Sequence, residues 1–235
     1  MQNVIKILML LVTITLASCS NRNPDLNEVA KEKVVPYVHK MMMYDSSNVL
    51  VGTGTGFDVE FKGKVYTLTN KHICQQYMAI ETSNQGEGGG IYMYQTFQVQ
   101  KENGEKLKIL KISQDHDLCL LETKAEKGLK ISRQDVELHD SVTVVGHPRG
   151  LPLTVRHGTM TASMNDIMPW VKATPIHYNL LTVVAYGGNS GSPITNKYGE
   201  VIGVLFAGFR EFHTETFAVP LTDLKVFFIQ FSMGR

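Results

Sequence analysis

This 235-residue chain has only three cysteines and one tryptophan, and neither basic nor acidic residues are in marked excess. Its three cysteines do not combine with histidines at the spacing of a zinc site. Six of the eight histidines show no paired ligand spacing either, at positions 39, 116, 139, 147, 157 and 177. The formal net charge is only +1, so nothing indicates a nucleic-acid partner.

Two motifs that would place the chain in other function classes are also absent. Gly52–Gly56 is glycine-rich, but it lacks the Gly-Lys-Ser/Thr ending and the following helix of a phosphate-binding loop. The pattern Gly-x-Ser-x-Gly fails because Ser192 stands where its last glycine should be. The chain shows neither an internal repeat nor a low-complexity region, and its composition, with 43% hydrophobic residues, is that of an ordinary globular protein.

The only leader-like feature is a short apolar run at the N-terminus. Ile7–Ala17 follows a single lysine and is too short to span a bilayer as a stable helix, which is typical of a secretory signal. The run ends in Leu16–Cys19, which resembles a bacterial lipobox. That resemblance implies cleavage before Cys19 and a diacylglycerol group on its thiol, while an ordinary signal with a chance cysteine is the alternative.

This N-terminus defines the first two segments of the chain. We expect a lipoprotein signal peptide over residues 1–18 and a polar tether over 19–33, with the mature protein exported and anchored to a bacterial cell membrane. Ser20 after the cysteine resembles the signal for the outer membrane in a Gram-negative cell. A Gram-positive surface and a phage-encoded lipoprotein remain alternatives. Without residues 1–18, basic and acidic side chains balance at 22 each.

The remainder, residues 34–235, is a succession of short apolar or alternating runs separated by turn residues. The pattern predicts an all-β domain of two lobes, over about 34–125 and 136–220. The charged stretch 124–135 fits a linker between the lobes. Apolar residues at helical spacing predict a C-terminal helix over 221–230, with Thr222 as its N-cap.

The most informative stretch is Gly188–Pro193, in which Ser190 lies between glycines after a predicted strand. A serine becomes a nucleophile only beside a base and an orienting acid. His72 at the end of a strand supplies the candidate base, and Asp117 at the start of another supplies the candidate acid, with Asp115 as a local rival. The backbone N–H groups of Gly188 and Ser190 would form the oxyanion hole. A turn between strands is the alternative for this stretch.

The order His, Asp, Ser together with several flanking motifs resembles the trypsin-like serine proteases of the chymotrypsin clan. The similarity is greatest to the bacterial HtrA and glutamyl-endopeptidase branches. The motifs that carry it, in order, are Gly54–Phe57, Leu68–His72, Asp117–Leu121, Val145–Gly150, Gly188–Pro193 and Phe217–Pro220. The resemblance covers about residues 34–230 and implies the chymotrypsin fold, in which each of the two lobes is a six-stranded β-barrel. It also implies an acyl-enzyme mechanism and a peptide substrate.

The departures from that family limit what is expected of this chain. Asn189 replaces the aspartate that trypsin-like zymogens place before the serine, so activation by insertion of a new N-terminus is not expected. By resemblance, five residues would line the primary specificity pocket: Val184, Ala185, Phe206, Ala207 and Gly208. None is acidic, which indicates an apolar pocket. His213 is a weaker candidate for pairing with an acidic substrate side chain.

Two further features stay open at the level of sequence. Cys74 and Cys119 each lie two residues after a proposed catalytic residue, and we favour two free core thiols over a disulfide. Residues 163–178 form an insertion, which we expect to be a packed surface loop rather than a lid. The sequence thus predicts a lipid-anchored serine endopeptidase that needs neither metal nor organic cofactor. A catalytically silent peptide-binding lipoprotein is the alternative.

Overall fold

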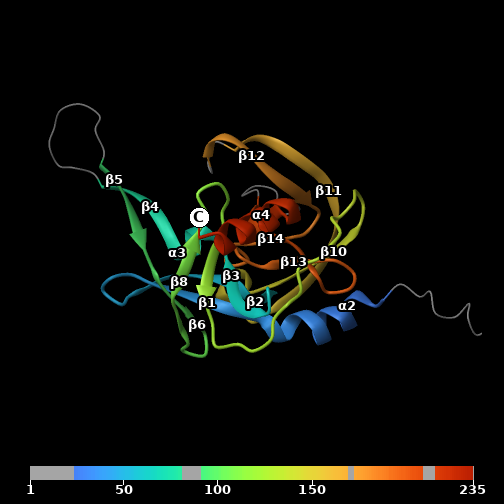
Figure 1. Ribbon diagram of the computed structural model, residues 1–235, viewed down its shortest axis with the longest axis horizontal. Coiled ribbons are helices and arrows are strands. Elements are labelled where there is room, and N and C mark those ends of the chain that lie inside the picture. Colours follow the sequence, from blue (N-terminus) through green and yellow to red (C-terminus); the bar gives the residue numbers. More distant parts are fainter. Residues whose placement is uncertain (1–23, 81–90, 169–171, 209–214, 235) are drawn as a thin grey trace, which may run out of the picture.

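The computed structural model describes residues 24–80, 91–168, 172–208 and 215–234. They form two β lobes with helix α4, Leu221–Ser232, packed against both (Figure 1). The predicted all-β fold with a C-terminal helix is confirmed. Within the described residues, no helix combines the length and apolar character that spanning a bilayer requires.

The first lobe is a seven-stranded antiparallel sheet with the order β7-β6-β1-β2-β3-β9-β8. Its strands are β1 (Val38–Tyr44), β2 (Leu50–Phe61), β3 (Lys64–Thr69), β6 (Gln98–Lys101), β7 (Lys106–Leu107), β8 (Ile109–Ile112) and β9 (Cys119–Glu122). Lys62 and Gly63 join β2 to β3 and both have positive φ, as a type I′ hairpin turn requires.

This lobe differs in detail from the predicted six-stranded barrel. Its sheet has seven strands, and β7 and β8 lie at the two ends of the strand order and are not paired with each other. Strands β4 (Gln75–Ile80) and β5 (Ile91–Thr96) pair only with each other and project from the lobe (Figure 1).

The second lobe is a closed barrel of six strands, as predicted, with the order β10-β11-β12-β15-β14-β13. Its strands are β10 (Ser141–Gly146), β11 (Thr154–Met168), β12 (Lys172–Leu181), β13 (Pro193–Thr195), β14 (Val201–Gly208) and β15 (Thr216–Pro220). Alternate residues of these strands, such as Val142 and Val144, point into a core of their own.

The expectation of a surface loop over residues 163–178 is wrong. Most of this segment belongs to the long antiparallel hairpin β11–β12, in which Ser163 pairs with Asn179 and Met168 with Lys172. The buried Tyr178 ring packs edge-on against Phe217 with 5.3 Å between the centroids. That burial of one face stabilises the segment as a strand.

The range 19–33 is not a tether throughout. Helix α2 covers Leu26–Val29, and single turns follow over Ala30–Val34 (η2) and Val35–Tyr37 (η3). The Asp25 side chain caps α2 by accepting a hydrogen bond from the Asn27 N–H at 2.8 Å. Ala30 and Val34 lie four residues apart, so both face the main core and are buried. The second half of the expected tether is therefore part of the folded domain.

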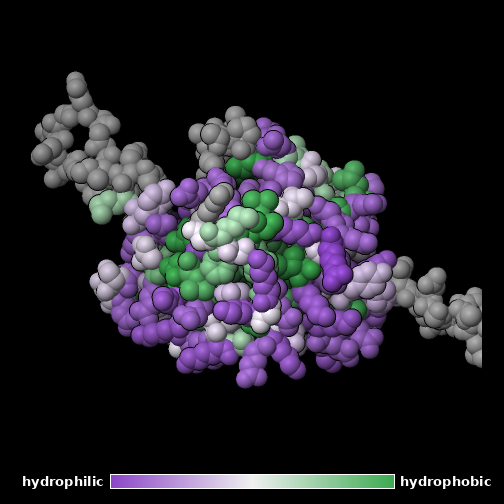
Figure 2. All heavy atoms as spheres, in the orientation of Figure 1, coloured by the Kyte–Doolittle hydropathy of each residue, from purple (hydrophilic) through white to green (hydrophobic). Residues whose placement is uncertain are grey.

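Helix α4 confirms the predicted C-terminal helix but begins one residue before Thr222, so Pro220 and not Thr222 occupies the N-cap. Its buried face joins the lobes: Phe228 packs on Phe61 of the first lobe at 4.7 Å between ring centroids. Its outer face exposes Val226 and Ile229. Figure 2 shows hydrophobic side chains in the area of α4, surrounded by hydrophilic ones.

Candidate active site

His72 and Asp117 meet because their strands are neighbours. His72 lies on α3 (Lys71–Cys74), the single helical turn that follows β3, and Asp117 lies just before β9. Strands β3 and β9 pair with Thr69 opposite Cys119, which brings both residues to the same end of the sheet. The Nδ1 atom of His72 is 2.6 Å from Oδ2 of Asp117, and the His72 N–H donates to Oδ1 at 3.0 Å.

The neighbours of Asp117 fix its orientation. The Asn70 side-chain amide donates to the Asp117 carbonyl oxygen at 2.8 Å. Asp115, the rival in the sequence, is exposed, and its N–H bonds to the Ser113 hydroxyl. The carboxylate that faces the imidazole is therefore that of Asp117.

This pairing changes the acidity of the imidazole. Burial by itself lowers the pKa of His72, but the charge of Asp117 and its hydrogen bond more than offset that effect. The pKa of His72 is therefore raised above its ordinary value. A base with a raised pKa holds an accepted proton more firmly, which suits proton transfer during acyl transfer.

Cys74 and Cys119 form a disulfide, so the expectation of two free thiols is wrong. The bridge links α3 to β9 across 45 residues of sequence, and both cysteines are buried. It lies two residues beyond His72 on one side and two beyond Asp117 on the other. The disulfide thus ties together the two segments that carry the paired side chains.

Ser190 lies in a tight loop with left-handed residues on both sides, Gly188 at φ 93° and Gly191 at φ 87°. A Cβ at Gly188 would lie 2.5 Å from the His147 carbonyl oxygen, so only glycine fits there. The Gly191 N–H donates to the Leu205 carbonyl at 2.8 Å. The serine is partly exposed, whereas Asn189 before it is buried.

The backbone around Ser190 has the features of an oxyanion hole. The Gly187 carbonyl accepts a hydrogen bond from the Arg149 N–H at 2.5 Å. In a trans peptide the N–H points opposite to the carbonyl, so the N–H of Gly188 faces away from Arg149. Within the described residues, neither this N–H nor that of Ser190 donates a hydrogen bond. Both remain available to a substrate oxygen.

The two halves of the site approach each other across Gly54 of β2. A Cβ on this glycine would lie 2.5 Å from the Ile73 side chain, next to His72, and 3.3 Å from the Ser190 carbonyl oxygen. No hydrogen bond joins the His72 imidazole to the Ser190 hydroxyl in the described part of the chain. Such contacts are often long before substrate binds.

Comparisons with known proteins identify the family of this chain. Residues 54–204 match the model of the trypsin-like peptidase domain, which is well over half of the chain. The chain belongs to the trypsin-like peptidase family. A serine endoprotease of Yersinia pestis is similar in structure, with a TM-score of 0.63, 23% identity, and coverage of 90% of this chain and 68% of that one. The active form of the Rv3671c protease of M. tuberculosis gives a TM-score of 0.66 at 18% identity, over 87% and 86% of the two chains.

Membership makes the protein a serine-type endopeptidase that acts on proteins or peptides. Of the five residues expected to line the primary pocket of this trypsin-like peptidase, Ala185 and Phe206 are buried in the cores. Val184 and Ala207 are partly exposed, and Gly208 is exposed. His213 and Cys19 lie outside the described residues.

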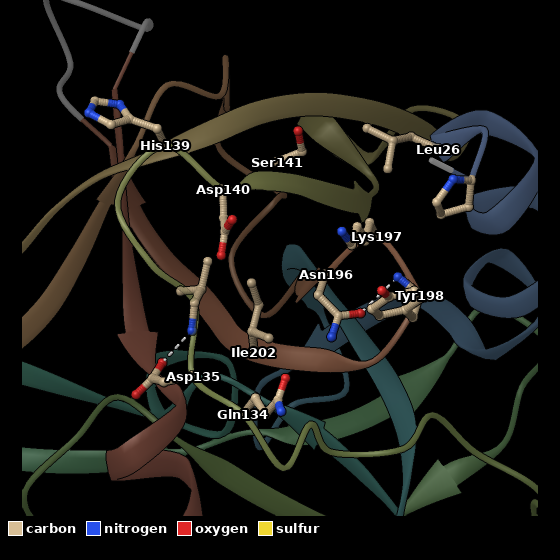
Figure 3. Close-up of a pocket in the computed structure, with 12 residues that line it drawn as sticks. Leu26, Gln134, Asp135, His139, Asp140, Ser141, Asn196, Lys197, Tyr198 and Ile202 are labelled. Atoms are coloured by element: carbon tan, nitrogen blue, oxygen red, sulfur yellow. Dashed lines mark hydrogen bonds between the residues drawn. The ribbon is translucent and has the colours of Figure 1, made fainter. Parts of the chain in front are cut away.

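One cavity of the peptidase lies away from these residues. This cavity, of about 610 Å³, lies between the start of α2 and the turn after β13, and Figure 3 shows the residues that line it. It is lined by Leu26, His139, Asp140 and Lys197, among others, and contains neither His72, Asp117 nor Ser190. The candidate catalytic residues therefore lie outside this cavity.

The sequence reasoning missed two residues that support this site. Asn70 and Thr55 both lie within motifs that carried the family resemblance, but their contacts cross 47 and 133 residues of chain. Only a signal from the three-dimensional structure identifies such partners.

Proposed function

We propose that this peptidase cleaves peptide bonds through a triad of Ser190, His72 and Asp117. The observation that carries the proposal is the pairing of His72 with Asp117 through two hydrogen bonds, to the ring Nδ1 and to the backbone N–H. A carboxylate on Nδ1 leaves Nε2 as the nitrogen that can accept the proton of the serine hydroxyl.

The chemistry follows from these positions. Ser190 Oγ attacks the substrate carbonyl carbon while His72 Nε2 takes its proton. The N–H groups of Gly188 and Ser190 stabilise the oxyanion, and His72 then protonates the leaving amine as the peptide bond breaks. Water, activated by the same imidazole, hydrolyses the acyl-enzyme and restores the serine. No step calls for a metal or an organic cofactor.

The substrate side chain before the cleaved bond is proposed to be small or medium and apolar. Val184, Ala185, Phe206, Ala207 and Gly208 provide no charge that could balance a lysine or arginine. Cleavage of a peptide library, with Ser190→Ala as the control, tests this preference. Dominant cleavage after basic residues would contradict it.

A fluorophosphonate probe distinguishes this function from that of a silent peptide-binding protein. The wild type should be labelled at Ser190, and the Ser190→Ala variant, folded to the same unfolding temperature, should not. A well-folded wild type that remains unlabelled would establish the silent alternative.

We further propose that the peptidase is held on a bacterial membrane by a diacylglycerol group on Cys19, at the periplasmic face or the cell surface. The lipobox-like Leu16–Cys19 at the end of an apolar run supports this. The mature N-terminus should carry the lipid by mass spectrometry, and Cys19→Ser should move the protein from the membrane to the soluble fraction. An unmodified Cys19 in the mature protein would refute the anchor.

A further inference from the structure

Thr55 is a fully buried polar residue of the first lobe. It contacts the loop of the second lobe that carries Ser190, residues 187–192. It lies in β2 between Gly54 and Gly56, with 0% of its surface exposed. Buried hydroxyl groups are expensive unless they are hydrogen-bonded, so the partners of this one are informative.

Three hydrogen bonds join Thr55 to the second lobe. Its hydroxyl donates to the Gly188 carbonyl at 2.8 Å, and its backbone N–H donates to the Ser190 carbonyl at 2.8 Å. The same hydroxyl accepts from the His147 N–H at 3.0 Å. One residue therefore holds the carbonyl groups of both candidate oxyanion donors.

A fourth hydrogen bond connects Thr55 with the histidine segment. The Thr69 hydroxyl donates to the Thr55 carbonyl at 2.6 Å, and Thr69 lies three residues before His72 at the end of β3. Gly191, directly after the nucleophile, packs against the Thr55 carbonyl and the Thr69 hydroxyl so closely that a Cβ could not be accommodated.

We propose that Thr55 is a positioning residue that sets the oxyanion donors and Ser190 in register with His72. Gly188 is fixed from both sides: Arg149 holds the peptide plane before it through the Gly187 carbonyl, and Thr55 holds the plane after it. Because each peptide unit is planar, fixing these carbonyls limits the direction of the Gly188 N–H. This inference rests on the proposed function, in which that N–H stabilises the oxyanion.

The hydroxyl can be removed at nearly constant volume. Thr55→Val leaves the Gly188 carbonyl and the His147 N–H without their shared partner, whereas Thr55→Ser keeps the hydroxyl. A matched control is Thr195→Val: Thr195 is equally buried, and its hydroxyl donates to the Thr143 carbonyl within the second barrel.

Two measurements on the full chain test the proposal. The first is the saturating rate of fluorophosphonate labelling and the apparent affinity for the probe. Thr55→Val should lower the rate by about 10- to 100-fold with little change in affinity, because misplacement of about 1 Å costs that much. Thr55→Ser and Thr195→Val should stay within about threefold of wild type.

The second is hydrogen exchange of the amides in residues 187–192, which does not depend on activity. Thr55→Val alone should speed this exchange roughly fivefold or more, the effect of losing one hydrogen bond. Wild-type exchange in Thr55→Val, or equal labelling of the valine and serine variants, would overturn the positioning role. An unlabelled wild type would instead refute the proposed function, and the exchange data would still decide whether Thr55 holds the loop.

Discussion

Cys74 forms a disulfide with Cys119, and each cysteine lies two residues after one member of the hydrogen-bonded pair His72 and Asp117. The covalent link and the hydrogen bonds therefore join the same two segments, α3 and the start of β9. The strand pairing of β3 with β9 already places these segments together. The disulfide makes that arrangement less dependent on the stability of the surrounding sheet.

Removal of the disulfide should destabilise the protein more than it impairs the chemistry. For two cysteines 45 residues apart, the chain-entropy model gives about 4 kcal/mol of stability. The variant Cys74→Ala/Cys119→Ala should lose roughly that much free energy of unfolding in urea. Wild type treated with a reductant is the matched control, and an unchanged urea midpoint in both samples would show that the bridge does not form.

Replacement of Asp117 should nearly abolish activity without unfolding the protein. Asp117→Asn should reduce the labelling rate of Ser190 by about 10³- to 10⁴-fold, because the amide no longer fixes the tautomer of His72 or stabilises its cation. Asp115→Asn removes an exposed carboxylate two residues away and should stay close to wild type. Equal losses in the two variants would contradict the assignment of Asp117 as the orienting acid.

The pH dependence of labelling should follow His72. Activity requires the neutral imidazole, so it should rise as the pH increases through the raised pKa of His72, above the ordinary value for histidine. The contribution of the His72–Asp117 ion pair to the free energy of unfolding changes with pH in the opposite direction. It is complete below the pKa that His72 has in the unfolded state and is lost as the pH rises through its pKa in the folded state. NMR titration of His72 in Ser190→Ala measures the pKa directly.

A second variant gives this prediction its control. In Asp117→Asn, the charge and hydrogen bond that raise the pKa of His72 are absent and the effect of burial remains. The midpoint should therefore move to lower pH. A midpoint that is the same in both backgrounds would mean that Asp117 does not determine the charge state of the histidine.

The parts of this fold that sequence predicted are those with a local signal. His72 and Asp117 each lie at an end of an apolar strand, and the glycines around Ser190 mark a tight turn. The disulfide was not predicted, because no sequence pattern reports the distance between Cys74 and Cys119.

Two segments were assigned to the wrong class for related reasons. Residues 163–178 were expected to form a surface loop, but the burial of Tyr178 against Phe217 keeps a strand there. The polar composition of 19–33 suggested a tether, but Ala30 in its second half is buried in the main core together with Val34. In both cases tertiary packing outweighed the local signal.

A buried ion pair in the first lobe provides the last prediction. Asp58, only 3% exposed, accepts hydrogen bonds from Thr67 at 2.5 Å and from Lys101 at 3.1 Å to each oxygen, and it lies 2.7 Å from His39. Burial alone would raise the pKa of Asp58, but the hydrogen bonds with His39 and Thr67 and the charge of Lys101 outweigh it. The pKa of Asp58 is therefore lowered.

Asp58→Asn should cost about 3–5 kcal/mol in the free energy of unfolding near neutral pH, because it removes the principal counter-charge of the buried Lys101. Glu126→Gln, at an exposed position, should cost less than about 0.5 kcal/mol. Asp58→Leu combined with Lys101→Met should recover much of the loss, since an apolar pair needs no compensation in the core.

Because the pKa of Asp58 is depressed in the folded state, the contribution of its charge to stability is present above the unfolded-state pKa. It is lost as the pH falls through the folded-state pKa. Urea unfolding at neutral and acidic pH should therefore show the gap between wild type and Asp58→Asn shrinking in acid, and a gap that stays constant would mean that the charge of Asp58 is not what stabilises the lobe.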